Sequence, residues 1–113
     1  MIKAQCHCGN VQLTFESVPD TMTQCNCSIC RRYAVRWLYF KQKEVKLDCS
    51  KEAVQYIWGD KMIAFHHCPI CGCITHYTSV SGSDFDRIAI NANLLSGEII
   101  ENLKVRYFDG ASM

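Results

Sequence analysis

The chain has 113 residues, and 12 Lys and Arg side chains nearly balance 11 Asp and Glu side chains. This balance excludes the broad basic footprint that binding to a nucleic acid or an anionic membrane requires. No apolar run approaches the ~20 residues of a membrane-spanning helix, so we expect one soluble domain over residues 1–113.

The predicted elements are short strands that follow one another closely. Residues 11–15 alternate apolar and polar side chains, as a half-buried strand does. Residues 34–40 are mostly apolar and predict a strand covered on both faces. Further strands are expected at residues 45–49, 54–58, 62–66, 74–80, 87–92 and 101–108, with 54–66 as a hairpin around Gly59-Asp60 and residues 93–97 as one helical turn ended by glycine. Short strands at this density predict an all-β fold.

The cysteines carry most of the functional information. Eight of the nine stand in three clusters: Cys6-x-Cys8, Cys25-x-Cys27-x2-Cys30, and Cys68-x2-Cys71-x-Cys73. Such spacings bring several sulfur atoms within reach of one ion, for which zinc is the default. Disulfides are the alternative, but an odd count leaves one thiol over. The first residues also lack a hydrophobic leader, so we expect the reducing cytoplasm, where paired thiols more often bind metal.

Four of these cysteines predict a closed metal site. Cys68-Pro69-Ile70-Cys71-Gly72 has the form of a zinc knuckle, in which proline fixes one φ angle and glycine permits the turn. Cys6 and Cys8 face the same way in an extended segment and supply a second pair. A zinc ion with four thiolates has no open position and is structural.

Cys25, Cys27 and Cys30 predict a second site with only three protein ligands. Three ligands leave one position of a tetrahedral zinc open, which is the arrangement of a catalytic site. A metal-bound thiol is deprotonated, so an incoming substrate thiol suits that position. A fourth ligand from Cys73, Cys49 or a histidine would instead close the site.

Several other residues have two interpretations. Arg31 and Arg32 follow the three-cysteine cluster and either bind a substrate carboxylate there or are simply solvated. The histidines at 66, 67 and 76 are most simply hydrogen-bonded strand residues, although one of them could move a proton. Core positions are the simplest expectation for Cys49, Trp37, Tyr39 and Trp58, and a free or buried thiol for Cys73.

The clusters together resemble the glutathione-dependent formaldehyde-activating enzyme family. The resemblance rests on Cys6-His7-Cys8-Gly9-Asn10-Val11, on Cys25 to Arg32, on Cys68 to Gly72, and on Trp37, Ile90-Asn91-Ala92 and Phe108-Asp109-Gly110. It implies a β-tent-like fold of short coiled sheets with two zinc ions. It also implies a structural zinc at Cys6, Cys8, Cys68 and Cys71, and a functional zinc at Cys25, Cys27 and Cys30.

The activity that this resemblance implies joins glutathione to formaldehyde as S-hydroxymethylglutathione, or reverses that addition as a carbon–sulfur lyase. A small-molecule thiol is then the expected partner. The residues by themselves leave two alternative functions open. One is a binding module whose zinc ions only stabilise the fold, and the other is a thiol or metal sensor that uses the three-cysteine site.

Overall fold

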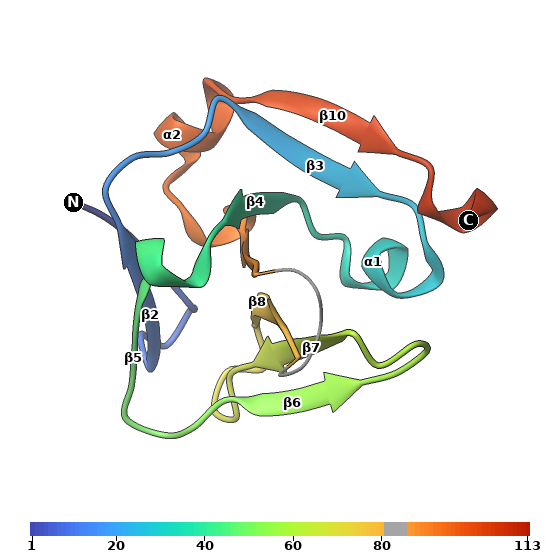
Figure 1. Cartoon of the computed structure of the whole chain (residues 1–113). Coiled ribbons are helices and arrows are strands. Elements are labelled where there is room, and N and C mark those ends of the chain that lie inside the picture. The colour runs from blue at the N-terminus through green and yellow to red at the C-terminus, as the bar shows by residue number, and fades with distance from the viewer. Residues whose placement is uncertain (81–85) are drawn as a thin grey trace.

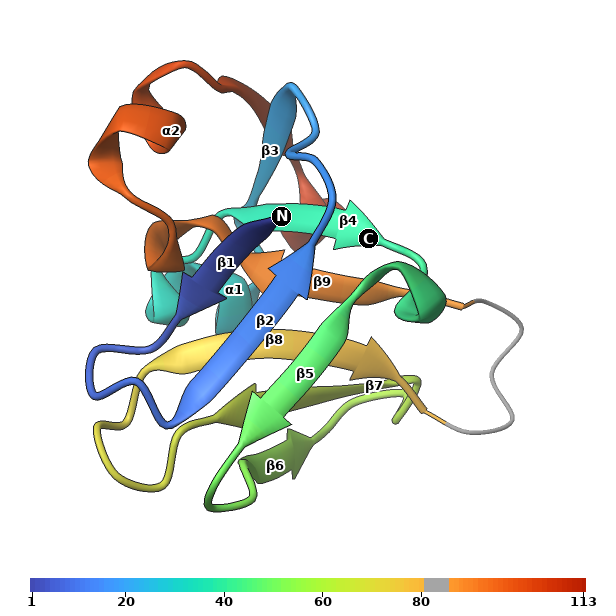
Figure 2. The same cartoon turned by 90° about the vertical axis from the view of Figure 1, so that its left-hand side faces the viewer.

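The computed structural model describes residues 1–80 and 86–113, and over these residues the fold is mostly β, as predicted. Within them ten strands form two sheets. The small sheet has the order β1-β2-β5 and the large sheet the order β10-β3-β4-β9-β8-β7-β6 (Figures 1 and 2). In sequence order the strands are β1 (Ile2–Gln5), β2 (Val11–Phe15), β3 (Thr21–Cys25), β4 (Trp37–Phe40), β5 (Lys46–Cys49), β6 (Val54–Ile57), β7 (Ile63–His67), β8 (Ile74–Ser79), β9 (Ile88–Asn91) and β10 (Lys104–Phe108).

The helical segments are short. The α-helices are α1 (Ser28–Tyr33) and α2 (Gly97–Glu101), and the 3-10 turns are Gln42–Glu44, Ala92–Leu94 and Gly110–Ser112. None of the helices in the described part of the chain is long and apolar enough to cross a membrane.

The central strands of the large sheet are apolar because both of their faces are covered. Side chains alternate along a strand, so neighbours belong to different cores. Leu38 and Ile90 pack into the core against the small sheet, which lies in front of β4, β8 and β9 in Figure 2. Trp37 and Ala89 pack on the opposite face in an aromatic core that also contains Cys30 of α1.

The two edges of the large sheet differ. At one edge β10 runs parallel to β3, with Phe108 opposite Cys25, and both strands lead toward α1 (Figure 1). This pairing holds the segment after β10 beside the cysteines that follow β3. At the other edge, within the described residues, β6 pairs with β7 alone, and its four residues are all exposed.

The structure corrects five predictions about local structure and burial. A helix, α1, precedes β4, so residues 34–36 are not part of a strand. Gly97 begins a helix and does not end one, and β10 starts at residue 104 because residues up to 101 belong to that helix. Cys49 and Trp58 are exposed, whereas core positions were expected. Cys49 ends β5 and Trp58 directly follows β6, and both of these strands lie at the edge of a sheet.

Candidate metal centres

The first group consists of four thiols from two segments that lie far apart in the sequence. The Sγ atoms of Cys6, Cys8, Cys68 and Cys71 all lie within 4.8 Å of one another. Cys6 and Cys8 have their sulfur atoms 3.7 Å apart, and the Cys8 and Cys68 sulfur atoms are 3.6 Å apart. A tetrahedral zinc with zinc–sulfur distances of about 2.3 Å has sulfur atoms about 3.8 Å apart. The donor set and its spacing therefore fit a zinc ion.

Two similar turns present these thiols. One follows β1, where the Gly9 N–H donates to the Cys6 carbonyl at 3.1 Å, and the other follows β7, where the Gly72 N–H donates to the Cys68 carbonyl at 3.0 Å. Both glycines have positive φ, 83° and 81°, a region that is costly for residues with a Cβ. The glycines thus let each turn close tightly enough to bring two sulfurs together.

Backbone amides donate hydrogen bonds to sulfur atoms of this four-thiol group. The Val11 N–H donates to Cys6 Sγ at 3.3 Å, and the Ile70 N–H donates to Cys68 Sγ at 3.4 Å. A hydrogen bond from the Cys73 backbone lowers the pKa of Cys71 to about 5. Cys73 itself lies outside the four-thiol group, which leaves it as the free thiol expected from the sequence.

The second group, the three-thiol group, is local in sequence. The Sγ atoms of Cys25, Cys27 and Cys30 lie within 4.8 Å of one another, and no further His, Cys, Asp or Glu of the described residues completes this set. Cys25 ends β3, Cys27 caps α1, and Cys30 lies one turn into α1. The helix supplies the turn that brings the third sulfur back toward the first two, and the sequence analysis did not predict it.

Cys30 is fixed against the aromatic core. The Trp37 indole N–H donates to Cys30 Sγ at 3.4 Å, a buried contact. Burial raises the pKa of the Cys30 thiol to about 12, so a nearby cation is needed to hold it as a thiolate. The three thiols, as a donor set, also fit a zinc ion, for which thiolates are preferred ligands.

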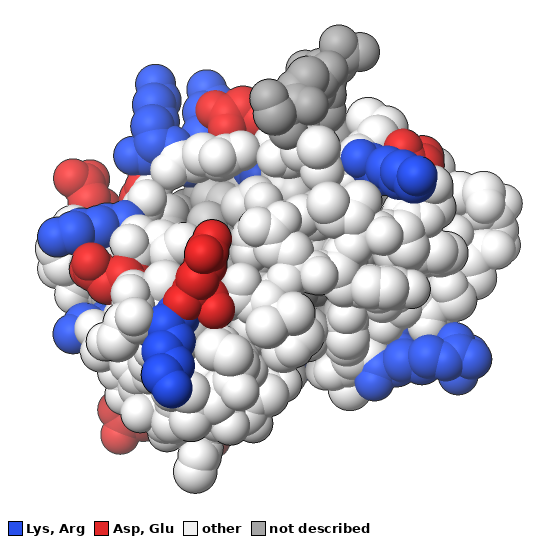
Figure 3. Space-filling view, turned by 90° about the horizontal axis from the view of Figure 1, so that it is seen from below, with Lys and Arg blue, Asp and Glu red and all other residues white. Residues whose placement is uncertain are grey.

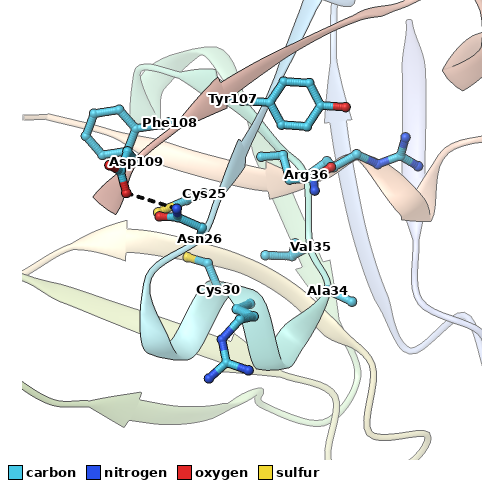
Figure 4. A pocket seen from close by; sticks show the side chains of 11 residues that line it. Cys25, Asn26, Cys30, Ala34, Val35, Arg36, Tyr107, Phe108 and Asp109 are labelled. Atoms are coloured by element: carbon cyan, nitrogen blue, oxygen red, sulfur yellow. Dashed lines mark hydrogen bonds between the residues drawn. The ribbon is translucent and has the colours of Figure 1, made fainter. Parts of the chain in front are cut away.

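The three-thiol group separates two cavities. One has a volume of about 540 Å³ and is bounded by Arg31, Arg36 and the end of β10; we call it the arginine cavity (Figure 4). The other, of about 430 Å³, is walled by aromatic side chains; we call it the aromatic cavity. Cys25, Cys30 and Phe108 line both cavities, so the thiols face two different chemical environments.

Arg31 and Arg32, which follow the three-cysteine cluster, have side chains in different surroundings. Arg31 lines the arginine cavity, whereas Arg32 donates to the Ser28 carbonyl at 2.9 Å and lines neither cavity at the thiols. Arg36 lines the arginine cavity too, but its guanidinium donates to Asn93 Oδ1 at 2.8 Å and extends away from Cys25 and Cys30 in Figure 4. Arg36, which lines the arginine cavity, and Arg87, which lines the aromatic cavity, were not among the residues predicted from the sequence. Arg87 comes to lie over Tyr39 through the pairing of β9 with β4, a contact between distant segments.

The histidines lie outside both thiol groups, as their simpler interpretation predicted. His66 and His76 stack with ring centroids 4.2 Å apart. His66 Nε2 pairs with Thr78 Oγ1 at 3.0 Å, and His76 Nδ1 pairs with Thr75 Oγ1 at 2.7 Å. His76 Nε2, in contrast, is buried and has no hydrogen-bond partner among the described residues.

The segment after β10 is tied to the middle of the three-thiol group. Asn26, between two of the thiols, donates from Nδ2 to Asp109 Oδ1 at 2.9 Å and accepts the Ala111 N–H at 2.9 Å. Its own backbone N–H donates to the Phe108 carbonyl at 3.2 Å. Gly110 therefore passes directly over Cys25, so close that a Cβ at this position would stand 2.6 Å from Cys25 Sγ.

Replacing Gly110 by alanine should weaken metal binding at the three-thiol group. The new methyl group would force Cys25 Sγ to rotate away, because carbon atoms in contact stand about 3.5–4.0 Å apart. Changes that reorient a ligand lower metal affinity about 10–100-fold, and we expect a loss in that range. Competition with a chromophoric chelator measures it. Gly97→Ala is the control, because a Cβ at Gly97 would have no described atom within 4 Å apart from its chain neighbours and the backbone of its own helix. Equal affinities in the two variants would refute the prediction.

The chain is similar to one known protein family and to a solved structure. Residues 1–104 match the family described as glutathione-dependent formaldehyde-activating enzyme. No curated protein matches the chain significantly. A crystal structure of a Rhodobacter sphaeroides protein has the same fold, with a TM-score of 0.73 and 22% identity over 93% of this chain and 100% of that one. The match over most of the sequence shows that the chain belongs to the glutathione-dependent formaldehyde-activating enzyme family.

Proposed function

We propose that this protein is a zinc-dependent enzyme that makes or cleaves the carbon–sulfur bond of a thiol–aldehyde adduct, such as S-hydroxymethylglutathione. The observation that carries the proposal is the three-thiol group, which gathers Cys25, Cys27 and Cys30 without a fourth donor from the described residues. A group of this kind leaves one position of a tetrahedral ion for a substrate. The four-thiol group, in contrast, is complete and would hold a structural zinc.

The chemistry needs little from the protein besides the metal and a place for each half of the adduct. A zinc ion at the three-thiol group supplies a Lewis acid that lowers the pKa of a substrate thiol. In cleavage the carbon–sulfur bond breaks and its electron pair stays on sulfur, while the hydroxyl group on carbon loses its proton and becomes the aldehyde oxygen. The proton passes to the thiolate or to solvent, so the reaction is balanced without an oxidant or reductant.

The side chains divide these tasks. Cys25, Cys27 and Cys30 hold the metal, and Trp37 donates a hydrogen bond to Cys30 Sγ. Arg31, on the wall of the arginine cavity, would bind a carboxylate of an acidic thiol such as glutathione. Two groups of reduced cysteines are needed, which is why we place the protein in the cytoplasm.

The test is the rate at which the zinc-loaded protein cleaves S-hydroxymethylglutathione, measured as formaldehyde release above the spontaneous rate. The wild type should exceed the spontaneous rate, and Cys27→Ser should not. Cys73→Ser is the matched control, because Cys73 belongs to neither thiol group, and it should keep the wild-type rate. A wild type no faster than the blank would favour a zinc-held binding module instead.

Arg31→Ala should weaken binding of glutathione more than binding of ethanethiol, which has no carboxylate. An exposed ion pair contributes at most about 1 kcal/mol, so we expect a threefold to fivefold rise in the glutathione Kd. Arg32→Ala is the matched control, because Arg32 is the next residue of α1 but lines neither cavity at the thiols. Calorimetric titration of both thiols decides the outcome. An equal loss for both would mean that Arg31 acts on the metal and not on the substrate.

A further inference from the structure

We propose that the aromatic cavity binds an apolar group on the carbonyl side of the adduct, so that the preferred substrate is a thiol adduct of an aryl or bulky alkyl aldehyde. This inference rests on the proposed function, and it names the substrate class of that same site. Formaldehyde contributes a single carbon atom. A cavity of about 430 Å³ beside the thiols is far larger than one carbon requires, and it falls in the range of small-molecule sites.

The wall of this cavity is apolar and already in place. Trp37 and Tyr77 pack edge to face with ring centroids 4.9 Å apart, and the Phe65 and Tyr77 centroids are 5.6 Å apart. Trp37 and Phe65 are each only 1% exposed, so their rings are held by the core. A rigid aromatic wall favours burial of an apolar or aromatic group, because little side-chain freedom is lost on binding.

The cavity begins at the sulfur atoms themselves. Cys25, Cys27 and Cys30 all line it, and Trp37 both lines it and donates to Cys30 Sγ at 3.4 Å. A carbon group attached to a substrate sulfur at the three-thiol group would therefore have the aromatic wall within reach. The arginine cavity on the other side of the thiols remains for the body of the thiol.

The charges in the aromatic cavity suit a neutral group. The Arg87 guanidinium lies over the Tyr39 ring, 4.2 Å from its centroid, and donates to the Tyr77 hydroxyl at 3.4 Å. Asp60 also lines the cavity, and its carboxylate accepts the Met62 backbone N–H at 3.1 Å. Among the described residues, the lining thus has one charged side chain of each sign, which gives no net preference for an ion. The Arg87 and Tyr77 pair instead offers hydrogen bonding to the oxygen atom of the adduct.

The mouth of the cavity is apolar as well. Trp58 and Phe108 line it and remain 41% and 38% exposed. Figure 3 shows the molecule from the side on which β6 lies, and most of that surface carries no charged side chain. Exposed aromatic side chains at the entrance of a cavity are typical of sites for apolar ligands.

Two stable glutathione thioethers that differ by one phenyl group on the carbon attached to sulfur test the inference. Zinc-loaded protein is titrated calorimetrically with S-methylglutathione, whose methyl carbon stands for the carbon of formaldehyde, and with S-benzylglutathione. We expect the benzyl compound to have a Kd about tenfold lower. Equal Kd values, or no binding of either compound, would overturn the inference, while the proposed function is judged separately by the rate of adduct cleavage.

Two variants test whether the phenyl group binds in the aromatic cavity. Trp58→Ala should reduce the tenfold preference to about threefold or less, because it removes one aromatic wall. Ile57→Ala is the matched control: Ile57 is the preceding residue, is 42% exposed, and does not line the cavity. The inference is overturned if Trp58→Ala keeps the full preference, or if both variants reduce it equally. Melting curves confirm that both variants are folded.

Discussion

Replacing Cys71 by serine should leave the protein unfolded or insoluble. Cys71 belongs to the four-thiol group, in which Cys8 and Cys68 are sixty positions apart and their sulfur atoms 3.6 Å apart. Zinc binding at such a site contributes about 10–16 kcal/mol to folding. The whole stability of a domain is about 5–15 kcal/mol, so loss of this site removes most or all of it. Far-UV circular dichroism and the soluble fraction on expression measure the result.

Cys73→Ser provides the comparison for this experiment. Cys73 lies two residues further along and is similarly half-buried, but it is not part of the four-thiol group. Its replacement should leave the melting temperature within a few degrees of the wild type, since substitutions away from such sites change stability by about 0.5 kcal/mol or less. A Cys71→Ser protein as stable as Cys73→Ser would contradict the structural role of the four-thiol group.

Replacing Cys27 by serine should have a different effect from replacing Cys71: the protein should stay folded but lose its activity. Cys27 is the N-cap of α1, and its backbone has an extended conformation that serine adopts easily. The three-thiol group would keep only two sulfur ligands, too few to retain the ion against a chelator. Elemental analysis should therefore show about one zinc per chain in place of two, and adduct cleavage should fall to the spontaneous rate.

The two cysteine variants together decide whether the thiol groups differ in role. The melting temperature of Cys27→Ser should stay near that of the wild type, because the four-thiol group and both cores remain intact. An equal loss of thermal stability in Cys27→Ser and Cys71→Ser would mean that both groups are structural. In that case the protein is better described as a zinc-stabilised binding module.

The sequence predicted the elements whose signal is local. Residues 11–15 alternate in polarity, and they form β2 with Val11, Leu13 and Phe15 buried. The cysteine spacings likewise predicted which sulfurs converge within each cluster, because a short turn fixes the distance between thiols two or three residues apart. Both signals depend on a few neighbouring residues and not on the rest of the fold.

What the sequence could not predict depends on distant contacts. The strand β3 consists of Thr-Met-Thr-Gln-Cys, which lacks a clear alternation and is a strand because β10 and β4 pair with it. The helix α1 has only six residues, too few for a helical period to be visible. The strand β5 does alternate, yet Leu47 and Cys49 are both exposed at the edge of the small sheet. Alternation predicts a strand but not whether anything covers it.

The cysteines of the two thiol groups differ in how far apart they lie in the sequence, and this has a consequence for zinc binding. Cys25, Cys27 and Cys30 lie within six consecutive residues and can bind an ion while the rest of the chain is unfolded. The four-thiol group exists only after distant segments have met, since sixty positions separate Cys8 from Cys68. An ion that also binds the unfolded chain stabilises the folded state less than one that binds only the native protein. The zinc ion at the three-thiol group should therefore stabilise the folded state less than the zinc ion at the four-thiol group.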